Sequence, residues 1–430
     1  MDNSIVRTTQ SVDIRYFKLN FFILVFGRLI SGIGSAILKF GLSLYVLDIT
    51  GSAVSFSLML ASSLLPGILV YMLMGNYVDS HNKKKIMVWT DILNGIIVLL
   101  FCGLFYNQFG NITILIVFTI IVGFVQSLFE LTIQSSVANV FPKEQVAKVD
   151  SAILGIGSII NVLGPVIGAF AYNSIGIKLI FLTNAITFLI AGFSTMFLKY
   201  NHNVEKKDWE LNGSYLEKSK VIFRYLEKEK GIKALLIFAV VINVIYSPMI
   251  NFVVPYISYN VLRVSSFQLS IIQASWAIGE IIGAIIIGSR KSVVPALKKL
   301  ILLIQIQALL VISWICLNFS VFQSEGNWLV TIAFSLIMIA IGVFNVIQLI
   351  PVYTFFQTYV PEELRARFIG IVGTSFMVSV PFGMAVFGFI LEKFNWTYVT
   401  AMSGFIMLLI CWVVSKNVHY KEFIKNIKIK

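Results

Sequence analysis

Long apolar stretches, separated by short segments that carry most of the charges, occupy most of this chain. One helical crossing of a bilayer core about 30 Å thick requires about 20 apolar residues. In lipid the backbone must satisfy its own hydrogen bonds, so stretches of this length are predicted to be helices, whereas barrel strands would be half as long and alternate in polarity. The pattern predicts twelve crossings, at 20–46, 55–78, 86–105, 112–139, 150–172, 178–198, 233–260, 268–288, 300–317, 329–358, 368–391 and 397–414.

Composition and charge placement add an orientation. The 430 residues are 58% hydrophobic and 12% charged, about half the charge of a soluble domain. Of the 33 lysines and arginines, all but five fall on one face of the predicted bundle; the others are Lys178, Arg263 and Lys393 on the opposite face and Arg28 and Lys39 inside the first span. Positive residues concentrate on the cytoplasmic side. Both termini are therefore predicted to be cytoplasmic, and the basic residues are expected to meet anionic lipid rather than nucleic acid.

Short motifs repeat at offsets of 213 to 219 residues, close to half the chain. Phe141–Gln145 matches Val360–Leu364, Gly164–Gly168 has a weaker match in Pro381–Gly383, and Gly75 matches Gly288. The repeats predict six spans duplicated in parallel, as in transporters whose halves rock about a central site. The predicted domains are an N-terminal six-helix bundle (1–198), a cytoplasmic central loop (199–232), and a C-terminal bundle with a short cytoplasmic tail (233–430). Within the loop, 214–230 is either an amphipathic helix on the inner leaflet or a solvated linker with partial helicity.

The connection between spans two and three contains Gly75, Asp79, Lys83 and Lys84. Glycine permits close helix approach, and an aspartate can face a helix N-terminus. A positive-inside turn would explain the lysines but not the spacing of Gly75 and Asp79. The segment resembles the signature loop of the major facilitator superfamily, G-x-x-x-D-x-x-G-R/K-R/K, although Asn82 replaces its second glycine and Ser80 its usual basic residue. The resemblance implies an all-α membrane fold of two pseudo-symmetric six-helix bundles. It also implies a gating role for this loop, to which we assign the nearby Asp91.

Gly164, Pro165 and Gly168 of span five resemble the G-P-x-x-G element associated with proton-driven exporters of this superfamily. Proline removes one helix hydrogen bond, and glycines let a neighbouring helix pack closely. Ile160 stands where the family has an earlier glycine, and span four lacks the family's arginine. An ordinary kinked packing site is therefore an alternative interpretation.

Short segments along the rest of the chain resemble one branch of the superfamily. They are Thr50–Ala53, Leu65–Pro66 and Val360–Glu363. They look like the drug-exporter branch that includes macrolide-efflux-like and siderophore exporters. The resemblance implies export of a small amphipathic molecule.

Ionisable residues inside spans are costly, and each is a functional hypothesis by default. Arg28 in span one and Glu130 in span four both lie roughly 12–15 Å from the cytoplasmic end of their span. Both spans line the cavity in the family that the chain resembles, so we predict an Arg28–Glu130 ion pair. It either opens to let Glu130 take up a proton or is a permanent structural bridge. Glu280, deep in span eight, is the second candidate proton carrier.

Polar side chains near these charges are the candidate substrate contacts. They share helix faces or spans with one another, and aromatic walls with a few polar anchors suit an amphipathic ligand. Packing or lipid contact is the alternative for any one of them, and Pro248 and Pro255 are expected to break the regularity of span seven. The candidates are Ser31, Ser35, Lys39, Gln126, Gln134, Asn243, Tyr246, Asn251, Asn345 and Gln348.

Several kinds of site have no signal in this sequence. There is no phosphate-binding G-x-x-x-x-G-K-S/T loop, all three histidines lie in predicted loops, and the three cysteines are isolated. We therefore expect no cofactor, metal, nucleotide or enzymatic activity. The prediction is a monomeric transporter of a bacterial plasma membrane that exports a small amphipathic molecule, a drug or macrolide-like antibiotic, in exchange for protons. Alternatives are a lysolipid or siderophore transporter of the same fold and, from other classes, a membrane scaffold or membrane-embedded enzyme.

Overall fold

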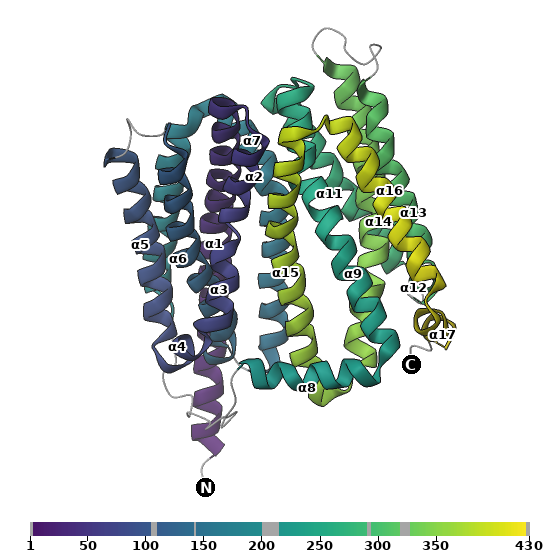
Figure 1. Ribbon diagram of the computed structural model, residues 1–430. Helices are drawn as coiled ribbons and strands as arrows, with labels where there is room; N and C mark the ends of the chain where they lie inside the picture. The colour runs from purple at the N-terminus through teal and green to yellow at the C-terminus, as the bar shows by residue number, and fades with distance from the viewer. Residues whose placement is uncertain are drawn as a thin grey trace. The chain divides into compact units, whose positions relative to one another are not determined.

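The computed structural model describes residues 3–104, 110–141, 143–199, 215–289, 294–318 and 327–426 (Figure 1). These residues are helical, and they include no strand. The long helices are α1 (Asn3–Thr50), α5 (Lys83–Leu104), α6 (Ile112–Val140), α7 (Lys143–Met196), α9 (Lys230–Pro248), α11 (Ser266–Gly288), α13 (Leu300–Ile312), α14 (Trp328–Tyr359), α15 (Glu362–Lys393) and α16 (Trp396–Lys416). The shorter ones are α2 (Ala53–Ser62), α3 (Leu65–Leu73), α4 (Gly75–Ser80), α8 (Tyr215–Lys228), α10 (Val254–Tyr256), α12 (Val294–Lys298) and α17 (Val418–Asn426).

Eleven helical segments of the described chain are long and apolar enough to cross a membrane. One of them, Gly155–Met196 in α7, has 42 residues and would measure about 63 Å as a single helix, twice the bilayer core. Gly176 interrupts it with φ 75° and ψ 166°, a conformation that a residue with a β-carbon rarely adopts. α7 is thus two helices joined at Gly176, and they account for the predicted spans five and six. The all-helical membrane fold with twelve crossings is confirmed.

The described residues form two compact units. The first is drawn from Met1–Ile49 and Ser62–Leu211, and the second from Thr50–Ala61 and Asn212–Lys430. α2, which the sequence assigns to the N-terminal bundle, therefore packs within the second unit. There Glu392 of α15 accepts hydrogen bonds from the Ser52 hydroxyl (3.0 Å) and the Val54 amide (3.3 Å) at the start of α2.

The first unit is packed around helices α5, α6 and α7. Phe101 of α5, Phe118 of α6 and Phe181 of α7 form an aromatic cluster with ring centroids 4.0 to 5.7 Å apart. Gly192 brings α7 against α5, because a β-carbon there would lie 3.2 Å from the β-carbon of Asp91. Close packing thus holds a buried acidic residue between two spans.

In the second unit the backbones of α11 and α14 approach each other closely. An added β-carbon at Gly279 would overlap the carbonyl oxygen of Ile339, and one at Gly342 would overlap that of Trp276. At Gly283 it would lie 2.6 Å from the Val343 carbonyl oxygen. Small residues spaced one turn apart permit such close packing in membranes. α11 and α14 are therefore locked side by side, which places Glu280 against α14.

Span seven is irregular, as its two prolines predict. After α9 ends at Pro248, π-helical turns cover Met249–Val253 and Ile257–Val261, with α10 and its Pro255 between them. Proline lacks the N–H that would bond to the preceding turn. Such single π-helical turns occur often at functional sites.

α8 lies in the predicted central loop, of which residues 200–214 are outside the described part. Ile222 and Leu226 are buried, whereas Phe223 is 58% exposed. The Tyr225 ring packs edge-on against Phe368 of α15, with centroids 6.4 Å apart, and burial raises the pKa of its hydroxyl to about 12. The segment is therefore an amphipathic helix docked on the second unit, and its contact with the inner leaflet stays a prediction.

Candidate functional site

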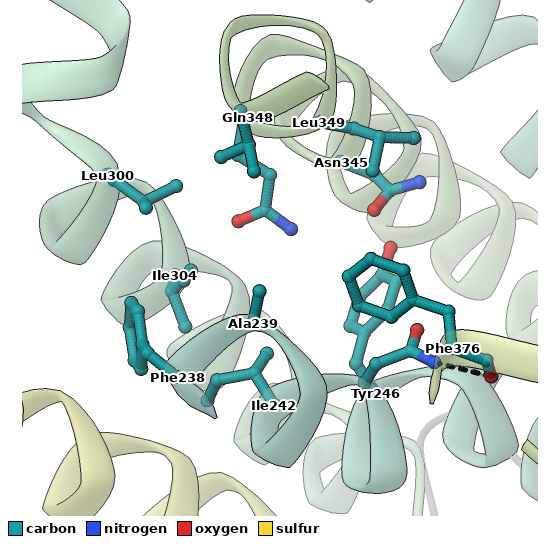
Figure 2. A pocket seen from close by; sticks show the side chains of 12 residues that line it. Phe238, Ala239, Ile242, Tyr246, Leu300, Ile304, Asn345, Gln348, Leu349 and Phe376 are labelled. Carbon is teal, nitrogen blue, oxygen red and sulfur yellow. Dashed lines mark hydrogen bonds between the residues drawn. The ribbon is translucent and has the colours of Figure 1, made fainter. Parts of the chain in front are cut away.

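A pocket of about 70 Å³ opens within the second unit between α9, α13, α14 and α15. Figure 2 shows the Tyr246 ring rising from α9 towards Asn345 and the Gln348 amide pointing into the space. Its lining is Phe238, Ala239, Ile242, Asn243, Tyr246, Leu300, Ile304, Asn345, Gln348, Leu349, Val352 and Phe376. Four predicted contacts, Asn243, Tyr246, Asn345 and Gln348, thus share one pocket.

Glu280 is joined to this pocket through a hydrogen bond. The Asn345 side-chain amide donates to the Glu280 carboxylate at 2.8 Å. Asn345 lies on α14, one turn from the Gly342 at which α11 and α14 touch, so the locked helix pair sets this contact. A carboxyl group at membrane depth is therefore tied directly to a pocket wall.

Two other polar atoms of the pocket lining are the Tyr246 hydroxyl and Gln348 Oε1. Gln348 Oε1 has no hydrogen-bond partner among the described residues, whereas the Tyr246 hydroxyl interacts with the indole of Trp276, which lies one turn from Glu280 on α11. Asn243 is satisfied, since its amide donates to the Ser379 hydroxyl at 2.6 Å. Buried polar groups in proteins are nearly always hydrogen-bonded. The Gln348 oxygen is therefore an acceptor that a ligand can satisfy.

Asn251 lies elsewhere. Its amide donates to the carbonyl of Ser247 in its own helix at 2.9 Å, and its side chain is exposed. The sequence missed Trp276, Phe238 and Phe376, although the spacing of Trp276 and Glu280 is a signal that could have found the first.

The predicted Arg28–Glu130 ion pair is present in the first unit. Nη1 of Arg28 on α1 donates to Oε2 of Glu130 on α6, and the two side chains are 8% and 22% exposed. Gln134, one turn further on α6, donates to the Tyr71 hydroxyl at 3.0 Å. Gln126 lies one turn before, and its Oε1 is buried without a partner in the described chain. Whether this pair opens or is permanent stays a prediction.

The remaining candidates on α1 are placed differently. The hydroxyls of Ser31 and Ser35 donate to carbonyls of their own helix, at 2.9 and 2.7 Å. Lys39 is partly buried. Among Arg28, Ser31, Ser35 and Lys39 of α1, Arg28 is the residue whose charged side chain bonds to another helix in the described part of the unit.

Asp91, which the sequence assigns to the gate loop, has a fully buried side chain on α5, and Gly192 of α7 lies against it. Glu130 of α6 is the charged group that acts on it. Asp91 lies two turns, about 12 Å, along the helix from Lys83. Neither carboxyl oxygen has a hydrogen-bond partner in the described chain, nor does the amide of Asn94 one turn further on. The sequence missed Asn94, whose i+3 spacing from Asp91 was the available signal.

The loop and the proline motif have mainly packing contacts. Gly75 begins α4, and the Lys83 ammonium donates to the Ser135 carbonyl of α6 at 2.9 Å. Lys84 is partly buried, and the side chain of Asp79 lies outside the described part.

The G-P-x-x-G motif packs α7 on α1. An added β-carbon at Gly164 would overlap Ala36, and one at Gly168 would lie 3.0 Å from the Phe40 β-carbon. Pro165 lies inside the helix. The contacts agree with a close helix crossing, and an antiporter-specific role stays a prediction.

Comparison with known proteins decides the family. The sequence profile of the Major Facilitator Superfamily matches residues 24–362, and in a second match 237–427. The chain belongs to the major facilitator superfamily. It is therefore a multi-pass membrane protein of a transporter family, whose members bind small-molecule substrates, and the resemblance drawn from its motifs is confirmed.

Individual relatives are distant but cover most of the chain. Macrolide efflux protein A of Streptococcus pyogenes is 22% identical over 396 residues, which are 92% of this chain and 94% of that protein. Macrolide efflux protein A of Enterococcus faecalis is 23% identical over 76% of this chain and 99% of that protein. The D-xylose-proton symporter superposes with a TM-score of 0.67 at 13% identity, covering 93% and 98% of the two chains. A bacterial homologue of ferroportin gives 0.66 at 11% identity, covering 93% and 100%. The solved structures confirm the fold of two six-helix bundles.

Proposed function

We propose that this protein is a secondary active transporter that exports a small amphipathic molecule, of the macrolide or related drug class, in exchange for protons. The observation that carries the proposal is the hydrogen bond from Asn345 to Glu280 at 2.8 Å. It connects a residue of the substrate pocket to a group that can bind a proton. The similarity to Macrolide efflux protein A over 92% of the chain supports the direction and the cargo class.

The pocket suits one part of such a molecule. Its aliphatic and aromatic walls would hold an apolar group, and the Tyr246 hydroxyl and Gln348 amide would bind polar substituents. Pockets for whole drug-sized ligands measure about 300–1,000 Å³, whereas this one has about 70 Å³. The second unit is therefore proposed to bind one arm of the substrate, with the ligand extending beyond this pocket.

Coupling follows from competition at Glu280. A hydrogen-bond donor or positively charged group of the substrate would bind the ionised Glu280 carboxylate, which also accepts from Asn345, whereas a proton on Glu280 removes the negative charge that holds this group. Glu280 would then release its proton when the substrate binds and take one up when the substrate leaves, so that the two are carried in turn. Each charge moved across the membrane is worth about 2.3 kcal/mol per 100 mV, so one proton can drive a useful concentration ratio.

The cellular setting is part of the proposal. The protein is proposed to act as a monomer in a bacterial plasma membrane with both termini cytoplasmic. Gating is proposed to involve the Gly75–Lys84 loop, and exchange to proceed by alternating access of one binding site. Catalysis is not part of the proposal, because fold and family are those of transporters.

Transport in vesicles tests the proposal. In proteoliposomes with an imposed pH gradient, a radiolabelled macrolide is expected to accumulate, and Glu280→Gln is expected to abolish the dependence on the gradient. Glutamine keeps the oxygen that accepts from Asn345 but cannot bind a proton. Glu392→Gln, at the end of α15 and outside the pocket, should transport as the wild type does.

Three outcomes would contradict parts of this scheme. Unchanged pH dependence in Glu280→Gln would remove Glu280 from coupling. Transport of a fluorescent lysophospholipid but not of macrolides would favour the lysolipid alternative. Transport of an iron-loaded siderophore would favour the siderophore alternative.

Tyr246→Phe separates binding from folding. The Tyr246 hydroxyl interacts with the Trp276 indole inside the unit, so its removal is expected to lower the free energy of unfolding by about 1 kcal/mol. Loss of one hydrogen bond to the substrate is expected to weaken macrolide binding about five-fold. Thermal melting and equilibrium ligand binding measure the two effects. A variant that binds as tightly as the wild type would show that this hydroxyl does not contact the substrate.

A further inference from the structure

The first unit buries two acidic side chains beside one arginine. Arg28 donates directly to Glu130, and both side chains keep some exposure. Asp91 is fully buried, and neither of its oxygens has a hydrogen-bond partner in the described part of the chain. The three groups lie on α1, α6 and α5, and the charge of Glu130 acts on Asp91.

The charged groups around Asp91 allow a charge count. Glu130 of α6 is the charged group that acts on Asp91, and Arg28 of α1 donates to that glutamate. The neutral hydroxyl of Tyr71 on α3 is influenced by Glu130 and Arg28. From α7 comes the backbone at Gly192, and the stretch between Lys178 and Lys199 contains no ionisable residue. One positive charge therefore serves two carboxyls. If both were ionised, the site would keep a buried and uncompensated negative charge, which is strongly disfavoured.

The hydrogen bonds show which carboxyl is neutral. Glu130 receives the guanidinium hydrogen of Arg28, the contact that stabilises an ionised carboxylate. Asp91 receives no hydrogen bond from any described residue. We propose that Asp91 is the proton-carrying group of the first unit and that Glu130 is the fixed, ionised partner of Arg28.

Asn94 completes the arrangement. It lies one turn from Asp91 on the same face of α5, is fully buried, and has no partner in the described chain for either side-chain atom. When the O–H bond of Asp91 breaks, the proton passes to water that enters the opened unit, and the carboxylate is left behind. The Asn94 amide can then donate to that carboxylate.

Infrared spectroscopy of the purified full-length protein tests the protonation state without a substrate. At neutral pH the wild type is expected to show the C=O stretching band of a neutral carboxylic acid, and Asp91→Asn to lose the Asp91 component of it. Thr90→Val, at the neighbouring buried position of α5, should keep the component. Glu280→Gln should also keep it, which separates Asp91 from the carboxyl of the second unit. If the neutral-carboxyl band is as strong in Asp91→Asn as in the wild type, the proposal is wrong.

Glu130→Gln gives a second, opposite test. Glu130 is the charged group that acts on Asp91, so without its negative charge the neutral-carboxyl component of Asp91 is expected to be lost at a lower pH than in the wild type. An Asp91 component that is lost at the same pH in both proteins would show that Glu130 does not influence the protonation of Asp91. Asp91→Asn should melt at the wild-type temperature, since asparagine resembles a neutral aspartic acid in size and charge, and a large fall in Tm would contradict the neutral state.

The role of this proton in transport rests on the proposed function. In proteoliposomes, Asp91→Asn is expected to lose accumulation driven by the pH gradient while exchange of labelled for unlabelled macrolide persists. Gradient-driven accumulation at the wild-type level would refute the coupling role. If the wild type moves no macrolide, the proposed function fails, whereas the infrared result on Asp91 stands independently.

Discussion

Glu130→Ala is expected to lower the free energy of unfolding by about 3–5 kcal/mol. The change removes the carboxylate that receives the guanidinium hydrogen of Arg28, whose side chain is only 8% exposed. An uncompensated buried charge accounts for the size of this effect, which exceeds that of a lost hydrogen bond. Thermal or denaturant unfolding of the purified protein measures it.

Two companion variants make this result specific. Gln134→Ala, one turn away on α6 and exposed, removes only the hydrogen bond to Tyr71 and is expected to change stability by less than about 1 kcal/mol. Arg28→Met combined with Glu130→Leu should recover most of the lost stability, because apolar replacements of a buried pair are often neutral or stabilising. Equal melting of Glu130→Ala and Gln134→Ala would show that Arg28 finds another partner and that the pair has no structural role.

Gly342→Ala is expected to disrupt the second unit. The added methyl would overlap the Trp276 carbonyl oxygen and lie 3.0 Å from the Glu280 amide nitrogen, both of which are backbone atoms of α11. Backbone atoms cannot rotate away, so the two helices must separate, and overpacking of this kind costs about 1–3 kcal/mol or more. The separation also moves Glu280 away from Asn345, so gradient-driven transport is expected to fall together with Tm.

Gly288→Ala is the matched control. It lies at the end of α11, and a β-carbon there would meet nothing within 4 Å. It should melt and transport as the wild type does. If Gly342→Ala behaves like Gly288→Ala, close approach of α11 and α14 is not required for the site.

The position of each residue along its span was predicted from the sequence, because the length of an apolar segment is a property of the chain alone. The spans, the separation of 150–172 from 178–198, and the breaks in span seven depend on local features such as Pro248 and Gly176. The Arg28–Glu130 pair was also predicted, because the two opposite charges lie at one depth on spans that line the cavity in the family that the chain resembles. Four polar residues of the pocket were found because they share two helices.

The sequence did not predict which face of each helix points towards its neighbours, and this orientation determines which side chains meet. Asp91 is two turns from the loop lysines in the sequence, yet it is fully buried, and Gly192 of α7 packs against it. Asn251 lies on the helix that supplies Asn243 and Tyr246, but it bonds within that helix instead of lining the pocket.

The sequence by itself determined the fold class, the crossings and the depth of each charge, because the cost of burying polar groups in lipid acts on every segment separately. Only the tertiary structure decided which side chains meet. That outcome depends on the glycines, such as Gly342 and Gly192, at which two helices come close together. The order of polar and apolar residues along a helix does not identify the neighbouring helix.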